Sequence, residues 1–176
     1  RCCAWLIASR ATRASSSVAD QGMSKSLINS DDISFVWLLS LRSKAYQLGR
    51  DEAAAFGDGV LMSHDDVGSI AFQGESRYIA LAMPRALLAP LVPDMGALFA
   101  RPVPASHPAQ RMLRRHLDLA QEDLIAGGPD LRAAFVEHTC DLLALALGAT
   151  RDAAERARLR GVPAARLRAI KDDVRR

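Results

Sequence analysis

The chain has 176 residues, of which 49% are apolar, and a formal net charge of +3, which is enough for one sizeable core with extensions. No apolar run approaches the roughly 20 residues needed to cross a bilayer, which excludes a helical membrane protein and predicts a soluble one. The three cysteines, Cys2, Cys3 and Cys140, cannot form a disulfide framework and have no CxxC spacing, which fits a reducing cytoplasm.

The N-terminal segment carries one predicted strand. Residues 1–17 are rich in Arg and Ser and have no acid before Asp20, a composition that mildly resembles a transit peptide. The apolar centre at residues 4–8 is too short for a signal-peptide core. It favours a single edge strand followed by a Ser-rich loop.

Residues 32–83 have the pattern of short antiparallel strands. One face of residues 33–41 is wholly apolar, which predicts a strand that lines a core. Residues 44–56 predict a strand hairpin in which Gly49 supplies the positive φ of the turn. Three further strands are predicted over residues 60–63, 69–73 and 77–83. Such closely spaced strands indicate an antiparallel sandwich or barrel.

The pattern then changes to helices. A first helix is predicted over residues 84–92, because Pro84 suits a first helical position and Pro93 ends the segment. A second, over residues 106–126, ends at a Gly-Gly pair. A third covers residues 131–147.

The third predicted helix has two apolar stripes. The first stripe contains Leu131, Phe135, His138, Leu142 and Leu145. The second contains Val136, Cys140, Leu143 and Leu147. Two apolar stripes indicate two buried faces, one for the chain itself and one for a second subunit. We expect the second stripe to form a homodimer interface, because in water it would expose a contiguous apolar patch.

Motifs for catalysis and metal binding are scarce. His64, Asp65 and Asp66 lie together, but a cupin metal site needs two histidines one residue apart, a following carboxylate and a later histidine. The sequence has no HxH, and its other three histidines lie in the helical region, so we expect no metal, no cofactor and a polar turn at this triplet. It also has no nucleophile elbow or phosphate-binding glycine loop, which predicts a protein that is not an enzyme.

The order of these segments resembles a known family. The series YQLGRDEAAAFGDGVLMSHDD, RYIALAMPRALLAPLVP, a helix hairpin and PAARLRAIKDDVRR is similar to the N-terminal regulatory half of AraC/XylS-type bacterial transcription regulators. Residues 83–88, MPRALL, match that family's strand-to-helix junction, and the resemblance runs from about Ser15 to the end. It implies an α+β fold, with a small antiparallel, metal-free, cupin-like β-barrel or jelly roll over residues 1–100. An antiparallel helix hairpin for dimerisation follows over residues 105–149.

The C-terminal residues are basic. Residues 151–176 carry nine Arg or Lys and four acids, a net charge of +5, which leaves −2 for the rest of the chain. Charge alone favours a solvated linker helix. The family resemblance implies that residues 150–176 are a linker and the first helix of a DNA-binding domain, whose two helix-turn-helix motifs are missing from this chain. Sequence-specific DNA binding then belongs to the full-length regulator.

The resemblance also implies a mechanism. A small-molecule effector or a partner alters the barrel, and thereby the placement of DNA-binding domains on adjacent half-sites. The candidate pocket residues are aromatic or polar side chains on the strands, namely Phe35, Trp37, Tyr46, His64, Phe72 and Tyr78. Plain core packing is the alternative for each of them. Two other classes of protein remain as alternatives, a cupin-type enzyme and a stand-alone small-molecule binding module.

Overall fold

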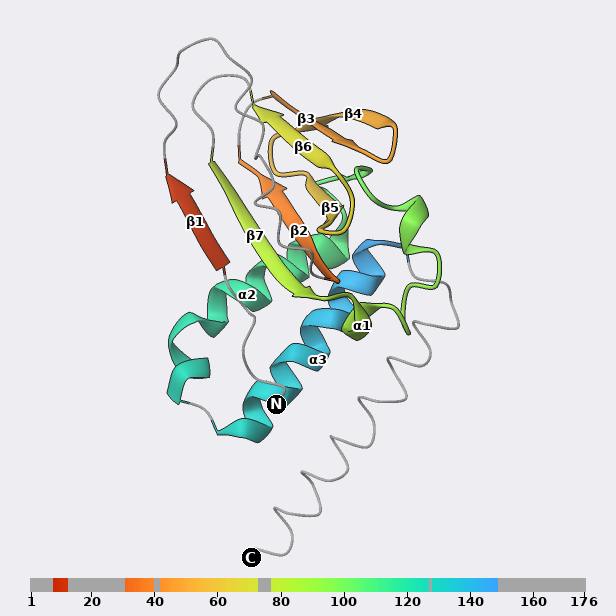
Figure 1. Ribbon diagram of the computed structural model, residues 1–176. Helices are drawn as coiled ribbons and strands as arrows, with labels where there is room; N and C mark the ends of the chain where they lie inside the picture. The colour runs from red at the N-terminus through yellow and green to blue at the C-terminus, as the bar shows by residue number, and fades with distance from the viewer. Residues whose placement is uncertain (1–7, 13–30, 40–41, 73–76, 127, 149–176) are drawn as a thin grey trace, which may run out of the picture.

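The structure, a computed structural model, describes residues 8–12, 31–39, 42–72, 77–126 and 128–148. These residues form two antiparallel sheets followed by a hairpin of two helices (Figure 1). The α+β fold expected from the sequence, with antiparallel strands before an antiparallel helix hairpin, is confirmed.

The larger sheet has five strands in the order β1-β7-β2-β5-β8. In that order the strands are β1 (Ala8–Thr12), β7 (Arg77–Pro84), β2 (Asp32–Leu38), β5 (Gly59–Ser63) and β8 (Pro102–Val103). All neighbours pair antiparallel, and Phe35 at the centre lies between Leu81 on β7 and Leu61 on β5. β1 is an edge strand, as predicted for the N-terminal segment. It begins at Ala8, and residues 4–7 of the predicted strand lie outside the described residues.

The smaller sheet has three strands in the order β4-β3-β6. They are β3 (Arg42–Gln47), β4 (Arg50–Ala55) and β6 (Gly68–Phe72). β3 and β4 form the predicted hairpin, and Gly49 in its turn has the predicted positive φ, of 75°. Leu48 before it also has a positive φ, of 53°. Two successive left-handed residues are what the tight turn of a two-residue hairpin requires.

The helical part consists of α1 (Arg85–Leu88), a 3-10 helix (Met95–Ala97), α2 (Pro108–Ala126) and α3 (Pro129–Ala146). α2 and α3 confirm the two helices of the predicted hairpin. α1 is a single turn and therefore shorter than the predicted helix 84–92. Pro84 is the last residue of β7, and Pro90 has no N–H with which to continue the helical hydrogen bonds.

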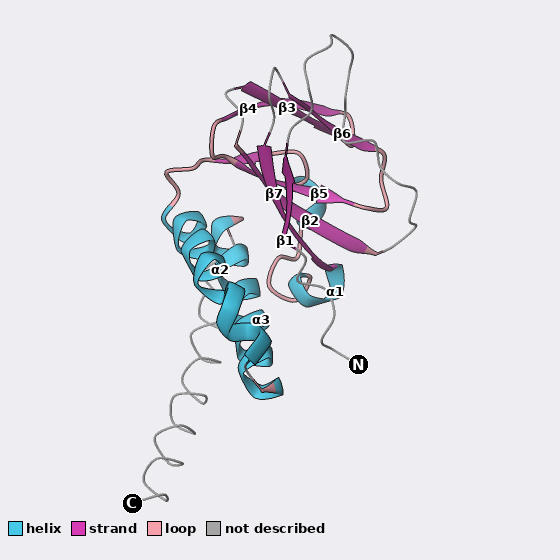
Figure 2. Cartoon of the chain, turned by 90° about the vertical axis from the view of Figure 1, so that its left-hand side faces the viewer, coloured by secondary structure: helices cyan, strands magenta, loops and turns pink. Residues whose placement is uncertain are grey.

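The elements stack in three layers, with the smaller sheet on one face of the larger sheet and the helices on the other (Figure 2). β2 separates two hydrophobic cores, because successive side chains on a strand point to opposite faces. Its residues Ile33, Phe35 and Trp37 pack toward the helices, whereas Val36 and Leu38 pack toward the smaller sheet. We call this second core, which lies between the two sheets, the inter-sheet interior.

Candidate functional site

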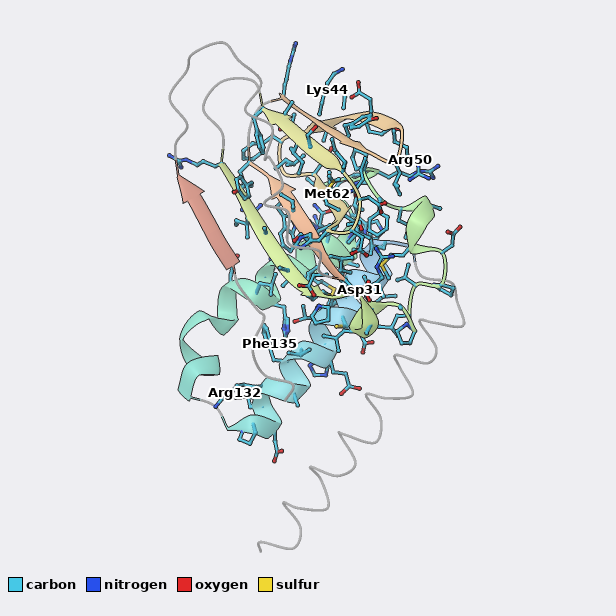
Figure 3. All side chains as sticks on the ribbon, viewed as in Figure 1. Asp31, Lys44, Arg50, Met62, Arg132 and Phe135 are labelled. Carbon is cyan, nitrogen blue, oxygen red and sulfur yellow. The ribbon has the colours of Figure 1, made fainter. Side chains whose placement is uncertain are left out.

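The inter-sheet interior is lined by small and apolar side chains from both sheets. Its buried members are Val36, Leu38, Ala45, Ala54, Val60, Met62, Ile70 and Ala100. Phe72, Tyr78 and Ala80 pack against them and are only partly buried. None of these side chains carries a charge, so a guest received between the sheets would meet uncharged and largely apolar surroundings. Met62, labelled in Figure 3, lies in the midst of this layer.

A polar pair stands at one end of the inter-sheet interior. Ser34 on β2 lies on the same face as Val36, and its hydroxyl is 2.7 Å from Nε2 of His64. The backbone N–H of His64 donates to the carbonyl of Asp32, which places the imidazole just beyond the end of β5. Ser34 is buried and His64 is partly exposed, so the pair joins the interior to the surface.

Gln47 closes the interior beside this pair. Its side chain is 1% exposed and fully hydrogen-bonded: Oε1 accepts from the N–H of Ser63 at 2.8 Å, and Nε2 donates to the carbonyls of Ser63 and Asp66 at 2.9 and 3.1 Å. These bonds tie β3 of the smaller sheet to β5 of the larger one. A buried amide satisfied in this way stabilises the packing, whereas an unpaired one would cost about 1–3 kcal/mol.

The other end of the interior is aromatic. Phe72 at the end of β6 and Tyr78 near the start of β7 stack with their ring centroids 5.9 Å apart and their planes 15° apart. Ser43 lies beside Phe72 in the register of β3 and β6 and is buried. Tyr78 at this end pairs with Leu38 on β2, and Leu38 is four residues along that strand from Ser34 at the other end. That is a separation of roughly 13 Å.

Arg85 joins the sheets to the first helix. Its guanidinium forms ion pairs with Asp31 at 3.0 Å and Asp65 at 3.3 Å, and donates a hydrogen bond of 2.9 Å to the hydroxyl of Ser63. It also lies 5.4 Å from the ring centroid of Phe99, within cation–π distance. Since Arg85 is the first residue of α1, these contacts fix that helix against the ends of β2 and β5.

The helix hairpin is joined by an aromatic contact. His116 on α2 stacks on Phe135 of α3 with ring centroids 4.1 Å apart, and its Nε2 is 3.5 Å from the Phe135 carbonyl oxygen. Burial lowers the pKa of His116, and the nearby His138 lowers it further, while the contact with the carbonyl has the opposite effect. The net effect favours the neutral form of His116. Phe135, labelled in Figure 3, lies where α3 faces α2.

The structure corrects the expected dimer face of α3. Three residues of the second stripe, Cys140, Leu143 and Leu147, are buried in the chain's own core between the helices and the larger sheet, and Val136 packs against that core. They are therefore not free to meet a partner. Burial also raises the pKa of the Cys140 thiol to about 11, with Asp141 and Glu137 adding to the shift.

The first stripe of α3 keeps three residues at the surface. Leu131 and Leu145 are 44% and 37% exposed and His138 is exposed, whereas Leu142 is partly buried against the core and Phe135 is buried. Together with Phe135 these residues alternate at spacings of four and three, the heptad pattern of a coiled-coil seam. We call this set, Leu131, Phe135, His138, Leu142 and Leu145, the α3 seam.

The six predicted pocket residues do not lie together. Phe35 and Trp37 form an edge-to-face pair in the core beneath the helices, with ring centroids 4.8 Å apart. Tyr46 is 47% exposed, because β3 turns Ser43, Ala45 and Gln47 inward and the residues between them outward. Alternation along β2 and β3 thus prevents the six from lining one pocket.

Phe72, Tyr78 and His64 do face the inter-sheet interior, at its two ends. The sequence prediction missed Ser43 and Gln47 on the inward face of β3. Their signal was the alternation of β3 itself, in which Arg42 and Lys44 mark the outward face. Lys44, labelled in Figure 3, points away from the sheets toward Asp51.

The described residues lack two features that other functions would require. No three His, Cys, Asp or Glu side chains gather there as metal ligands. Within the same part of the chain, no helix combines the length and apolar character needed to span a membrane.

Two antiparallel sheets around an uncharged core, backed by a helix hairpin, define a cupin-like fold. The family model described as an AraC-binding-like domain matches residues 13–148, and the chain belongs to this family. The chain is thus the regulatory, effector-binding region of an AraC-type regulator.

The comparison with solved structures supports the fold. The chain is similar to the crystal structure of the AraC-like transcriptional activator CuxR, with a TM-score of 0.54 and 20% identity. The match covers 69% of this chain and 44% of the CuxR chain, so the present chain spans less than half of that protein. No curated protein matches the sequence.

Proposed function

We propose that this region senses a small-molecule effector in the inter-sheet interior and pairs two copies of a bacterial, cytoplasmic transcription regulator. In the full-length regulator, pairing would set an attached DNA-binding domain on each of two adjacent half-sites. Effector binding would shift the balance between two arrangements of the sheets and helices. The family membership supports the regulatory role, and the uncharged interior supports the binding of a small molecule.

The proposal of a homodimer rests on the α3 seam. α3 already has a complete buried face in the chain's own core, through Cys140, Leu143 and Leu147. In the first stripe, Leu131, His138 and Leu145 nevertheless remain exposed, in heptad register with the buried Phe135 and the partly buried Leu142. A second copy would cover them by the knobs-into-holes packing that this spacing favours. The partner face proposed is thus the first stripe of the helix and not the second.

A fusion assay tests the proposal. The chain is joined to a monomeric DNA-binding domain that represses a reporter only when two copies bind adjacent half-sites. We expect the fusion to repress, and we expect Leu145→Arg on the α3 seam to abolish repression. Leu87→Arg on α1, where the leucine is 43% exposed, is the matched control and should repress like the parent. Equal repression by all three fusions would contradict pairing through the seam.

A further inference from the structure

Ser43 is an anomaly at the aromatic end of the inter-sheet interior. It is 4% exposed, and its Oγ has no hydrogen-bond partner among the described residues. The inward face of β3 places it between Ala54 on β4 and Phe72 on β6, both of which belong to the inter-sheet interior. A buried hydroxyl without a partner costs roughly 1–3 kcal/mol. The cost would be recovered if a ligand atom supplied the missing hydrogen bond.

The surroundings of Ser43 place it near the surface of the chain. Phe72, Tyr78 and Ala80 pack against the inter-sheet interior but remain partly exposed, so this end of it lies close to solvent. The positions next to Ser43 on β3 and β4 that point inward are Ala45 and Ala54, which fill little volume. A ligand entering at this end would meet two parallel aromatic rings, apolar walls and one unpaired hydroxyl.

The chemistry of this end discriminates between classes of ligand. A sugar needs a hydrogen bond for most of its hydroxyls, whereas Ser43 is the unpaired buried hydroxyl that borders Phe72 in the described part of the chain. An anion would have to lose its hydration without meeting a charged side chain on the inward-facing set. Other polar groups of the interior are engaged elsewhere, since Gln47 is bonded to Ser63 and Ser34 to His64.

We infer that the effector is an uncharged, flat aromatic compound with one polar group, which packs against Phe72 and Tyr78 and forms a hydrogen bond with Ser43. This inference rests on the proposal that the inter-sheet interior is the effector site. It adds the class of ligand, the end of the interior where it binds and the residues that recognise it. Aromatic rings favour such a ligand through offset stacking and apolar burial.

The test uses phenol, benzoate and glucose as probes, added to the isotopically labelled 176-residue chain and followed by amide chemical shifts. Phenol should shift the amides of β3, β6 and β7 around Ser43, Phe72 and Tyr78 and should saturate, and benzoate and glucose should not. Ser43→Ala should raise the dissociation constant for phenol by roughly five- to tenfold, the effect of one lost hydrogen bond. Tyr46→Phe, which changes an outward-facing tyrosine on β3, should leave that constant unchanged.

A second readout separates ligand recognition from a structural role. Because Ser43→Ala removes an unpaired buried hydroxyl, it should raise the melting temperature of the ligand-free chain while weakening phenol binding. A lower melting temperature would show that the hydroxyl has a structural partner, and would overturn the inference.

Three outcomes of the titration also overturn it. They are phenol binding that Ser43→Ala does not weaken, saturable binding of glucose or benzoate at this end in place of phenol, and no binding of any probe. The second outcome rejects the ligand class and leaves the effector site standing. The fusion assay uses no ligand, so the pairing part of the proposed function is decided independently of all three.

Discussion

The contrast between two leucines two residues apart on α3 tests the assignment of its faces. Leu143 is fully buried against the larger sheet, whereas Leu145 is 37% exposed on the α3 seam. Leu143→Ala should lower the free energy of unfolding by about 3 kcal/mol, the cost of a cavity at a buried leucine. Leu145→Ala should change the stability of the single subunit by no more than about 0.5 kcal/mol.

The effect of Leu145→Ala should appear instead in self-association. Full burial of a leucine stabilises by about 1.5–3 kcal/mol, so covering the exposed 37% of Leu145 contributes about 0.6–1.1 kcal/mol per copy. Both copies lose this contact, which amounts to about 1–2 kcal/mol, or a roughly five- to thirtyfold rise in the dimer dissociation constant. Sedimentation velocity over a concentration series measures this constant, and denaturant titration measures the free energy of unfolding.

A leucine on α1 provides the control for both measurements. Leu87→Ala, at a similarly exposed leucine on α1, should change neither quantity. The assignment of faces is wrong if Leu143→Ala separates the subunits while the single subunit keeps its stability. The dimer proposal itself fails if the parent chain sediments as a monomer at high micromolar concentration.

Three further predictions follow from single positions. Gly59→Ala should lower the free energy of unfolding by about 3 kcal/mol, because a Cβ there would overlap the buried Phe35 ring, while Gly128→Ala, with open space around it, should be nearly neutral in the same denaturant titration. Burial raises the pKa of the Cys140 thiol from 9.0 to about 11. The stability that the neutral buried thiol contributes is therefore fully present below pH 9.0 and is lost as the pH rises toward 11. Between pH 7.5 and 10 the parent should thus lose about 1 kcal/mol more than Cys140→Ala, and equal losses would refute the burial argument. Elemental analysis of the purified chain should find no stoichiometric transition metal, and one bound ion per chain that is lost in His64→Ala would contradict this.

The strands and helices were largely predictable because their signals are local. The alternation of β2, the glycine in the β3–β4 turn and the Gly-Gly pair after α2 each act within a few residues. The single turn of α1 was missed because a proline at position 90 interrupted a segment that was otherwise helical in pattern.

The faces of the elements were less predictable, since they depend on which other elements cover them. All of residues 33–38 on β2 are buried, so alternation could not tell that Phe35 and Trp37 face the helices and Val36 and Leu38 the smaller sheet. The two stripes of α3 are likewise equivalent in sequence. Only the packing of α3 on the larger sheet shows that the stripe with Leu143 is core.

The central claim, that the chain is a regulatory region that pairs two DNA-binding domains through the α3 seam, is tested most directly by the cooperativity of the fusion on DNA. Occupancy of two adjacent half-sites is measured against occupancy of one isolated half-site for the parent, Leu145→Arg and Leu87→Arg fusions. The account predicts cooperative binding for the parent and for Leu87→Arg, and independent binding of the two half-sites for Leu145→Arg. Independent binding by the parent fusion, or cooperative binding that survives Leu145→Arg, would contradict it.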